Sequence, residues 1–197
     1  MQTIVFIGDS VTDCDRLTIP PYGNGYVSLI AASAEIKANV INVGTSGHRL
    51  VDLEKRWNED VLENNPNILS IAIGVNDTWR RYDDNDVTDV VDFENRYRSL
   101  LTITRAECNS KFVLCEPFLL PVREEMNLWR EDLDPKIDVV HRLAKEFAAL
   151  LVPFDSEFTQ RSALSSMAEL AEDGIHPTAA GHALMAKLWL DTVSTYL

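Results

Sequence analysis

Residues 3–10 read TIVFIGDS, and the same pattern recurs along the whole chain. Thr3–Ile7 is a short run of apolar and β-branched residues that ends at Gly8. Such a run, bounded by a turn residue, predicts a strand that is buried in a parallel sheet. Ser10 then falls just past the strand end, on a turn that exposes its hydroxyl group. Taken alone, a serine in this position is more often an ordinary turn or helix-capping residue.

Four further strands are predicted by the same pattern, with amphipathic segments between them. The strands are Val40–Val43 (VINV), Ile68–Ile73 (ILSIAI), Lys111–Cys115 (KFVLC) and Leu150–Phe154 (LLVPF). The predicted helices are Tyr26–Lys37, Arg49–Glu63, Val90–Ala106, one from Asp134–Pro135 to about Ala149, and one from Pro177 to Leu190 or beyond. The last two starts rest on proline, which is favoured at the first position of a helix.

Strands that alternate with helices predict an α/β fold with a parallel sheet. Right-handed crossovers then give a three-layer α/β/α sandwich of the flavodoxin-like type, with a central sheet of about five strands. The 197 residues contain no internal repeat and no linker rich in Gly, Ser or Pro. We therefore expect residues 1–197 to form a single domain.

Composition narrows the classes of function. The formal net charge is −13, which argues against nucleic-acid binding because phosphate backbones are bound through Lys and Arg. The three cysteines have irregular spacing, which favours neither a disulfide framework nor a zinc site. No apolar segment is long enough to span a membrane, and no leader pattern precedes the first strand. We expect a cytoplasmic protein with neither a membrane nor a nucleic-acid partner.

Three polar clusters follow the first three predicted strands. They are Gly8–Ser10 (GDS), Gly44–His48 (GTSGH) and Gly74–Asp77 (GVND). Because the carboxyl ends of parallel strands meet at one edge of a sheet, we expect these clusters to lie together. There a glycine-rich turn lets backbone N–H groups approach an oxyanion, and an asparagine can add its side-chain amide. Each cluster alone is also consistent with an ordinary turn.

A fourth cluster, Asp173–Pro177 (DGIHP), lies far along the chain. An aspartate three residues before a histidine can place its carboxylate against one imidazole nitrogen. The other nitrogen is then free to take a proton from Ser10. The alternative is a capping aspartate next to a surface histidine.

These four clusters, in this order, resemble the SGNH hydrolase superfamily, also called GDSL esterases. Ser10, Gly47, Asn76 and His176 carry the four residues of the SGNH name. The stretches FIGDSVTDCDR, INVGTSGHRLVDLEKRW, IAIGVNDTWRRYD and DGIHPTAAGHALMA look most like the bacterial acetylxylan and carbohydrate acetylesterase branch. Cys14 lies near the family's GDSxTD run, and we attach no role to it.

The resemblance implies acyl transfer through a covalent intermediate. Ser10 is the expected nucleophile, His176 the base and Asp173 the residue that orients it. The N–H groups of Ser10 and Gly47 and the side chain of Asn76 are the expected oxyanion hole. This chemistry needs no cofactor and no metal.

The substrate class is inferred from aromatic residues near the expected site. Trp79 and Tyr82 are expected on a loop after Asn76, and Trp129 on another loop, where aromatic faces can pack against sugar rings. Together with a tentative contact from Asp9, they favour an acetylated sugar or xylo-oligosaccharide as the ester. Asp9 could equally tie the turn that presents Ser10. Residues 79–82 and 123–130 could instead serve a contact in a homo-oligomer.

Two other functions stay open at this point. A thioesterase or lysophospholipase would use the same acyl-transfer residues, so the motifs do not exclude it. A non-enzymatic, flavodoxin-like binding module is the second alternative. His48 is expected either to line the pocket or to start a helix and face water, and His141 and His182 are expected to be structural or solvent-facing. The acidic run Asp83–Asp86 lacks the pattern of a calcium loop.

Overall fold

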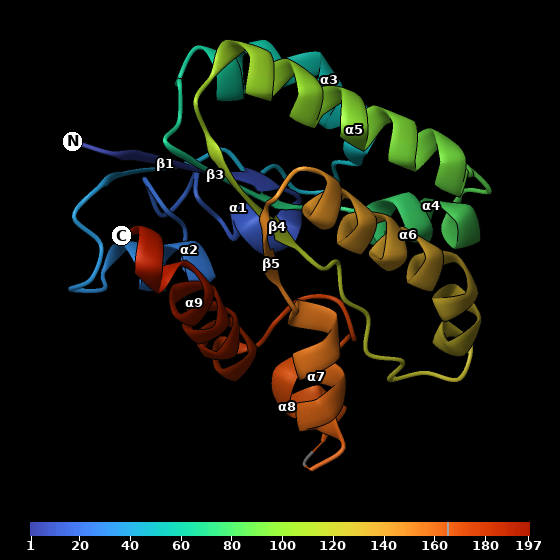
Figure 1. Cartoon of the computed structure of the whole chain (residues 1–197). Helices are drawn as coiled ribbons and strands as arrows, with labels where there is room; N and C mark the ends of the chain where they lie inside the picture. Colours follow the sequence, from blue (N-terminus) through green and yellow to red (C-terminus); the bar gives the residue numbers. More distant parts are fainter. Residues whose placement is uncertain (165) are drawn as a thin grey trace.

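The computed structural model describes residues 1–164 and 166–197, and its centre is a five-stranded parallel sheet (Figure 1). The strands are β1 (Thr3–Gly8), β2 (Asn39–Asn42), β3 (Ile68–Ala72), β4 (Lys111–Cys115) and β5 (Leu150–Val152). Their spatial order is β2-β1-β3-β4-β5, and all four pairings are parallel. This is the flavodoxin-like order, so the predicted fold class is confirmed.

Helices cover both faces of the sheet (Figure 1). One layer contains α2 (Tyr26–Ala31), α7 (Phe154–Ser162) and α9 (Ala179–Val193), whose apolar residues form one core cluster with the sheet. The other layer contains α3 (Leu50–Trp57), α5 (Val90–Glu107) and α6 (Met126–Glu146), which form a second cluster. Successive side chains of a strand point to opposite faces, so Ile4 and Phe6 join the first cluster and Val5 and Ile7 the second.

The remaining elements lie at strand ends and helix ends. They are α1 (Ser10–Asp13), a π-helical turn η1 (Asn58–Leu62), α4 (Val75–Asp83), α8 (Met167–Leu170) and a 3-10 turn η2 (Ser194–Tyr196). Two of them, α1 and α4, begin directly after β1 and β3. In this strand order β1 is flanked by β2 and β3, so the chain leaves β1 in one direction and later returns on its other side. Ligands of such sheets bind at that switch point.

The start of α6 corrects the sequence prediction. This helix begins at Met126, nine residues before Pro135, which lies inside it. Asp134 does not cap it and instead forms an ion pair with Arg130 at 2.6 Å. The earlier turns are held by a third apolar cluster that includes Met126, Trp129, Leu133, Ile137 and Ile175. This packing outweighs the loss of one backbone hydrogen bond at the proline.

Other segments also differ from the predictions. Residues 79–82 lie on helix α4, not on a loop, and Trp129 lies on α6. Helix α2 ends at Ala31, and β5 ends at Val152 because Pro153 is followed directly by α7. The last helix begins at Ala179 and is capped by the Thr178 side chain, which accepts a hydrogen bond from the Gly181 N–H. Within the described residues, no helix is both long and apolar enough to cross a membrane.

Candidate active site

Ser10 is the first residue of α1, at the carboxyl end of β1. Asp9 caps this short helix, because its carboxylate accepts a hydrogen bond from the Val11 N–H at 3.0 Å. Asp9 is only 3% exposed, so a substrate reaches little of it. Burial raises the pKa of Asp9 to about 6, although the Val11 N–H and the nearby His176 act to lower it. Asp9 therefore ties the turn that presents Ser10, as one of the two sequence interpretations expected.

Ser10, His176 and Asp173 form a continuous hydrogen-bonded chain. The Ser10 Oγ lies 2.9 Å from His176 Nε2, and His176 Nδ1 lies 2.7 Å from Asp173 Oδ2. A carboxylate only accepts hydrogen bonds, so in the neutral imidazole the ring proton sits on Nδ1. Nε2 then presents its lone pair to the Ser10 hydroxyl. The three side chains thus have the geometry that nucleophilic catalysis by serine requires.

The Asp173 carboxylate is held by backbone as well as by the imidazole. Its Oδ1 accepts from the N–H groups of Ile175 at 2.9 Å and His176 at 2.8 Å. Burial alone would raise the pKa of Asp173, but these bonds and the bond from the His176 ring outweigh it. The pKa therefore lies below its usual value, and the carboxylate stays ionised at neutral pH.

Gly174 fixes the loop that carries this pair. Its φ is +86°, and a Cβ at this position would lie 2.2 Å from the Leu120 carbonyl oxygen. The Gly174 carbonyl also accepts a hydrogen bond from the Leu120 N–H at 2.9 Å. Only glycine permits both the left-handed backbone and this approach. The loop after β4 therefore supports the segment from Asp173 to His176.

The loop after β2 offers a backbone N–H at an open position. Gly47 has φ +79° and is exposed, and no atom lies within 4 Å of the place where its Cβ would be. In the described part of the chain, the N–H groups of Ser10 and Gly47 have no acceptor. Free N–H groups at strand ends are the donors from which oxyanion holes are built.

Asn76 lies on the first turn of α4 and is 2% exposed. Its Nδ2 donates to the His48 carbonyl at 3.0 Å, which uses one of its two N–H groups. The neighbouring Asp77 is fully buried and accepts from the Leu50 N–H at 3.2 Å, at the start of α3. Burial raises the pKa of Asp77 to about 7, although the hydrogen bond from Leu50 and the charge of Lys136 both act to lower it. The two residues together connect α4 to the segment that follows Gly47.

Arg56 is a contact residue that the sequence analysis missed. Its guanidinium donates to the carbonyl oxygens of Val43 at 2.6 Å and Gly8 at 3.2 Å, and its Nε donates to His48 Nδ1 at 3.1 Å. It therefore joins the chain at the ends of β1 and β2. Burial, followed by the charge of Arg56, lowers the pKa of His48. An arginine on an amphipathic helix usually faces water, so the sequence carried no signal for this role.

The predicted aromatic residues form a row that begins at the imidazole. The ring centroid of Trp79 lies 6.2 Å from that of His176 and 5.9 Å from that of Trp129. Tyr82 stacks on Trp129 at 5.3 Å and donates its hydroxyl to the Leu128 carbonyl at 2.7 Å. Trp129 is 7% exposed, so Trp79 is the ring that stands beside the imidazole with part of its surface free.

The other histidines contact structural partners. One of these partners is Cys14, which contacts His182 although the two residues lie far apart in the sequence. His182 Nε2 lies 3.4 Å from Cys14 Sγ, and its Nδ1 accepts from the Tyr26 N–H at 3.2 Å. Burial lowers the pKa of His182 to about 4. His141 contacts the buried Glu116 at 2.5 Å. Among the described residues, no group of three or more His, Cys, Asp or Glu side chains could hold a metal ion.

Comparison with known proteins decides the family. A family model described as GDSL-like lipase/acylhydrolase matches residues 6–184. The chain belongs to the GDSL-like lipase/acylhydrolase family. It is therefore a carboxylic ester hydrolase, and the superfamily that its motifs predicted is confirmed. A non-enzymatic binding module is no longer a viable interpretation.

Two relatives match this GDSL acylhydrolase over nearly its whole length. An acetylxylan esterase of Geobacillus stearothermophilus is 33% identical over 96% of this chain and 92% of its own. A solved structure of an acetyl xylan esterase from the same organism has a TM-score of 0.88, covering 98% of this chain and 94% of that one. A structure described as a GDSL-like lipase of Parabacteroides merdae has a TM-score of 0.92 at 35% identity, covering 98% and 95%.

Proposed function

We propose that this chain is a serine esterase that removes small acyl groups, above all acetyl groups, from sugars. The observation that carries the proposal is the hydrogen-bonded chain from Ser10 through His176 to Asp173. Solved structures of the Geobacillus esterase include variants, described as catalytic mutants, that replace a serine, an aspartate or a histidine by alanine. These are the three residue types that meet here.

The first half of the reaction forms an acyl-enzyme. Ser10 Oγ attacks the ester carbonyl while its proton passes to His176 Nε2, and Asp173 stabilises the imidazolium that results. The carbonyl oxygen becomes an oxyanion, which the N–H groups of Ser10 and Gly47 and the second N–H of Asn76 bind. The imidazolium then returns its proton to the leaving alcohol oxygen as the bond between the acyl carbon and that oxygen breaks.

The second half releases the acid. Water attacks the acyl carbon while His176 Nε2 takes its proton, and a second oxyanion forms in the same place. Its collapse returns the proton to Ser10 Oγ and frees the carboxylic acid. Every proton in this cycle moves between substrate, water, Ser10 and His176.

Two observations support a sugar as the alcohol. Trp79 stands beside His176, the residue that protonates the leaving alcohol, and aromatic faces pack well on sugar rings. A further structure of the Geobacillus enzyme is described as an acetyl-xylooligosaccharide esterase. Tyr82 stacks on Trp129, farther along the row from His176 than Trp79, and Asp9 holds the Ser10 turn, so neither is proposed to contact the sugar directly.

Comparing acyl groups separates this function from a thioesterase or lysophospholipase. We expect kcat/KM for p-nitrophenyl acetate to exceed that for the decanoate ester and that for an acetyl thioester. Faster turnover of decanoate would favour a lysophospholipase, and faster turnover of the thioester would favour a thioesterase. The Ser10→Ala variant measures the background hydrolysis for all three substrates.

A further inference from the structure

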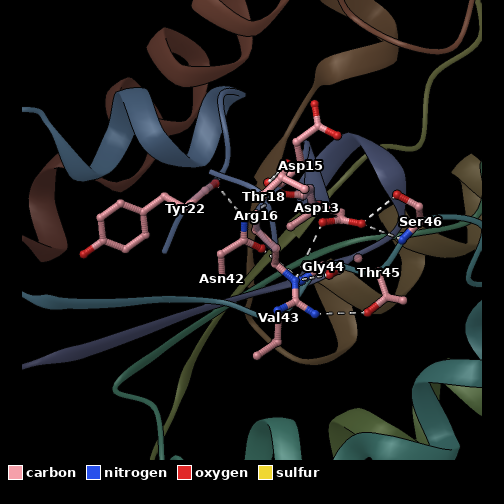
Figure 2. Close-up of polar contacts among 12 residues, drawn as sticks. Asp13, Asp15, Arg16, Thr18, Tyr22, Asn42, Val43, Gly44, Thr45 and Ser46 are labelled. Atoms are coloured by element: carbon pink, nitrogen blue, oxygen red, sulfur yellow. Dashed lines mark hydrogen bonds and ion pairs between the residues drawn. The ribbon is translucent and has the colours of Figure 1, made fainter. Parts of the chain in front are cut away.

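We propose that Asp13 is a positioning residue that sets the spacing of the oxyanion hole by binding Ser46, and this inference rests on the proposed function. Asp13 is the last residue of α1, which Ser10 begins, and Ser46 directly precedes Gly47. The side chain of Asp13 thus connects the helix of the nucleophile to the loop of the second N–H donor (Figure 2).

Two hydrogen bonds join Asp13 to Ser46. Asp13 Oδ2 accepts from the Ser46 backbone N–H at 3.0 Å and from the Ser46 hydroxyl at 2.6 Å. Hydrogen bonds to a carboxylate are stronger than those between neutral groups. The Asp13 side chain is 14% exposed and Ser46 is exposed, so this contact lies at the surface, where two hydrogen bonds rather than one hold the loop. Because the N–H of Ser46 is held, the peptide leading to Gly47 is held with it.

The same loop is fixed to α1 at a second point. A Cβ on Gly44 would lie 2.3 Å from the Asp13 backbone nitrogen, so the loop backbone packs directly on the helix. Arg16 donates from Nε to the Gly44 carbonyl at 2.5 Å, and the same Nε lies 3.8 Å from Asp13 Oδ1 (Figure 2). Gly44 therefore sets how closely the loop approaches α1, and Asp13 sets the position of its far end, next to Gly47.

The contact between Asp13 and Ser46 matters because the reaction requires two separate N–H donors at a fixed distance from one oxyanion. The N–H group of Ser10 belongs to the start of α1 and that of Gly47 to the loop after β2, and no short stretch of chain connects the two. Donors must nevertheless lie within about 2.7–3.1 Å of one oxyanion. A misplacement of about 1 Å can reduce catalysis as much as a hundredfold. Ground-state binding of the ester depends much less on this spacing, so the loss should appear in kcat.

The test compares Asp13→Ala with Asp13→Asn on p-nitrophenyl acetate. We expect Asp13→Ala to lower kcat by about 10- to 100-fold with KM changed less than about twofold. Asp13→Asn keeps an acceptor oxygen for Ser46 and should recover most of that loss. Asp15→Asn is the control for charge, because Asp15 lies two residues away, is exposed and does not contact Ser46.

A second measurement separates positioning from general disturbance of the fold. A small trifluoromethyl ketone forms a tetrahedral oxyanion on the serine, so its Ki should rise in Asp13→Ala by the factor by which kcat/KM falls. Ser46→Ala removes only the hydroxyl contact and should lower kcat by about three- to tenfold, with no further loss when combined with Asp13→Ala.

The outcomes are distinct. Wild-type kcat and Ki in Asp13→Ala, with Ser10-dependent hydrolysis intact, would overturn the inference and leave the proposed function standing. Hydrolysis by the wild type that is independent of Ser10 would overturn the proposed function, and the inference with it. If Asp13→Ala does not fold, Ser46→Ala decides, since an unchanged kcat and Ki in that variant would contradict the inference.

Discussion

The carboxylate of Asp173 controls which nitrogen of His176 carries the proton. An asparagine there would still accept the N–H groups of Ile175 and His176 through its oxygen. Its amide would, however, donate to Nδ1, so the ring proton would move to Nε2, which could no longer accept from Ser10. We expect Asp173→Asn to keep the thermal unfolding midpoint within a few degrees and to lower kcat by about 10³- to 10⁴-fold. Wild-type kcat in this variant would mean that Asp173 is not the orienting residue.

In the proposed mechanism the second amide proton of Asn76 has a different task, because it binds the oxyanion and is needed only when that charge forms. Removing one such donor costs about 2.7–4 kcal/mol in the barrier. We expect Asn76→Ala to lower kcat by about 100- to 1000-fold with little change in KM. Steady-state kinetics on p-nitrophenyl acetate measure both constants. A near-normal kcat would remove Asn76 from the oxyanion hole.

The positions of candidate site residues were predictable from the sequence where those residues directly follow a predicted strand. Ser10, Gly47 and Asn76 each follow a predicted strand, and the sheet then brings them to one edge. Arg56 and the pair of Cys14 with His182 gave no such signal, and Asp13, although it lies in the GDSxTD run, gave no sign of its contact with Ser46. Their partners are brought close by packing between segments that lie far apart in the sequence. Cys14 and His182, for example, are 168 positions apart. Composition and periodicity do not specify contacts of this kind.

Helices α3 and α4 are joined by one buried carboxylate, and this junction should respond to pH. The pKa of Asp77 is raised from 3.8 to about 7, so the folded chain holds a proton there at pH values where the unfolded chain does not. The stability contributed by Asp77 is therefore largest at low pH and falls as the pH rises from about 4 to about 7.

Asp77→Asn removes this titration, because an amide keeps an acceptor for the Leu50 N–H but carries no charge at any pH. We expect the variant to gain stability relative to the wild type as the pH rises from about 4 to about 7. Urea unfolding at several pH values measures the difference. Asp138→Asn, at an exposed position of α6, is the control and should show no such trend. Parallel pH curves for wild type and Asp77→Asn would refute a raised pKa.

Elements were predicted well where apolar periodicity was strong and poorly where proline was taken as a boundary. The five strands and helices α3 and α5 lie close to their predicted positions. The predicted start of α6 is nine residues too late, because proline is favoured at the first position of a helix and Pro135 instead lies inside this one. Yet Met126, Trp129 and Leu133 already have helical spacing, and they pack in the third apolar cluster. Helices α7 and α8 were not predicted.

At the scale of the whole molecule, the net charge of −13 should affect charged substrates. The field repels an anionic ester, and salt screens it because the Debye length shortens from about 10 Å at 0.1 M to about 3 Å at 1 M. We expect kcat/KM for 4-acetoxybenzoate to rise with salt, and that for its neutral methyl ester to stay nearly constant. Equal salt dependence of the two esters would contradict an effect of net charge.

The overall architecture followed from the order of elements alone, since alternating strands and helices allow few arrangements of a parallel sheet. That order placed three polar clusters at one edge before any distance was known, whereas the fourth was connected to Ser10 by the chemistry of its aspartate and histidine. A single domain, a cytoplasmic location, a homo-oligomer and the absence of a nucleic-acid partner remain predictions. Sequence patterns do not specify the shape of the pocket around the site, and that shape determines which ester is the preferred substrate.

In the proposed function, Ser10 removes acetyl groups from a sugar. The most direct measurement is acetate release from fully acetylated xylose by the wild type and by Ser10→Ala at equal protein concentration. We predict rapid release by the wild type and background release by the variant. No release by the wild type, while p-nitrophenyl acetate is still cleaved in a Ser10-dependent way, would contradict the sugar substrate. Equal release by both proteins would contradict the nucleophile.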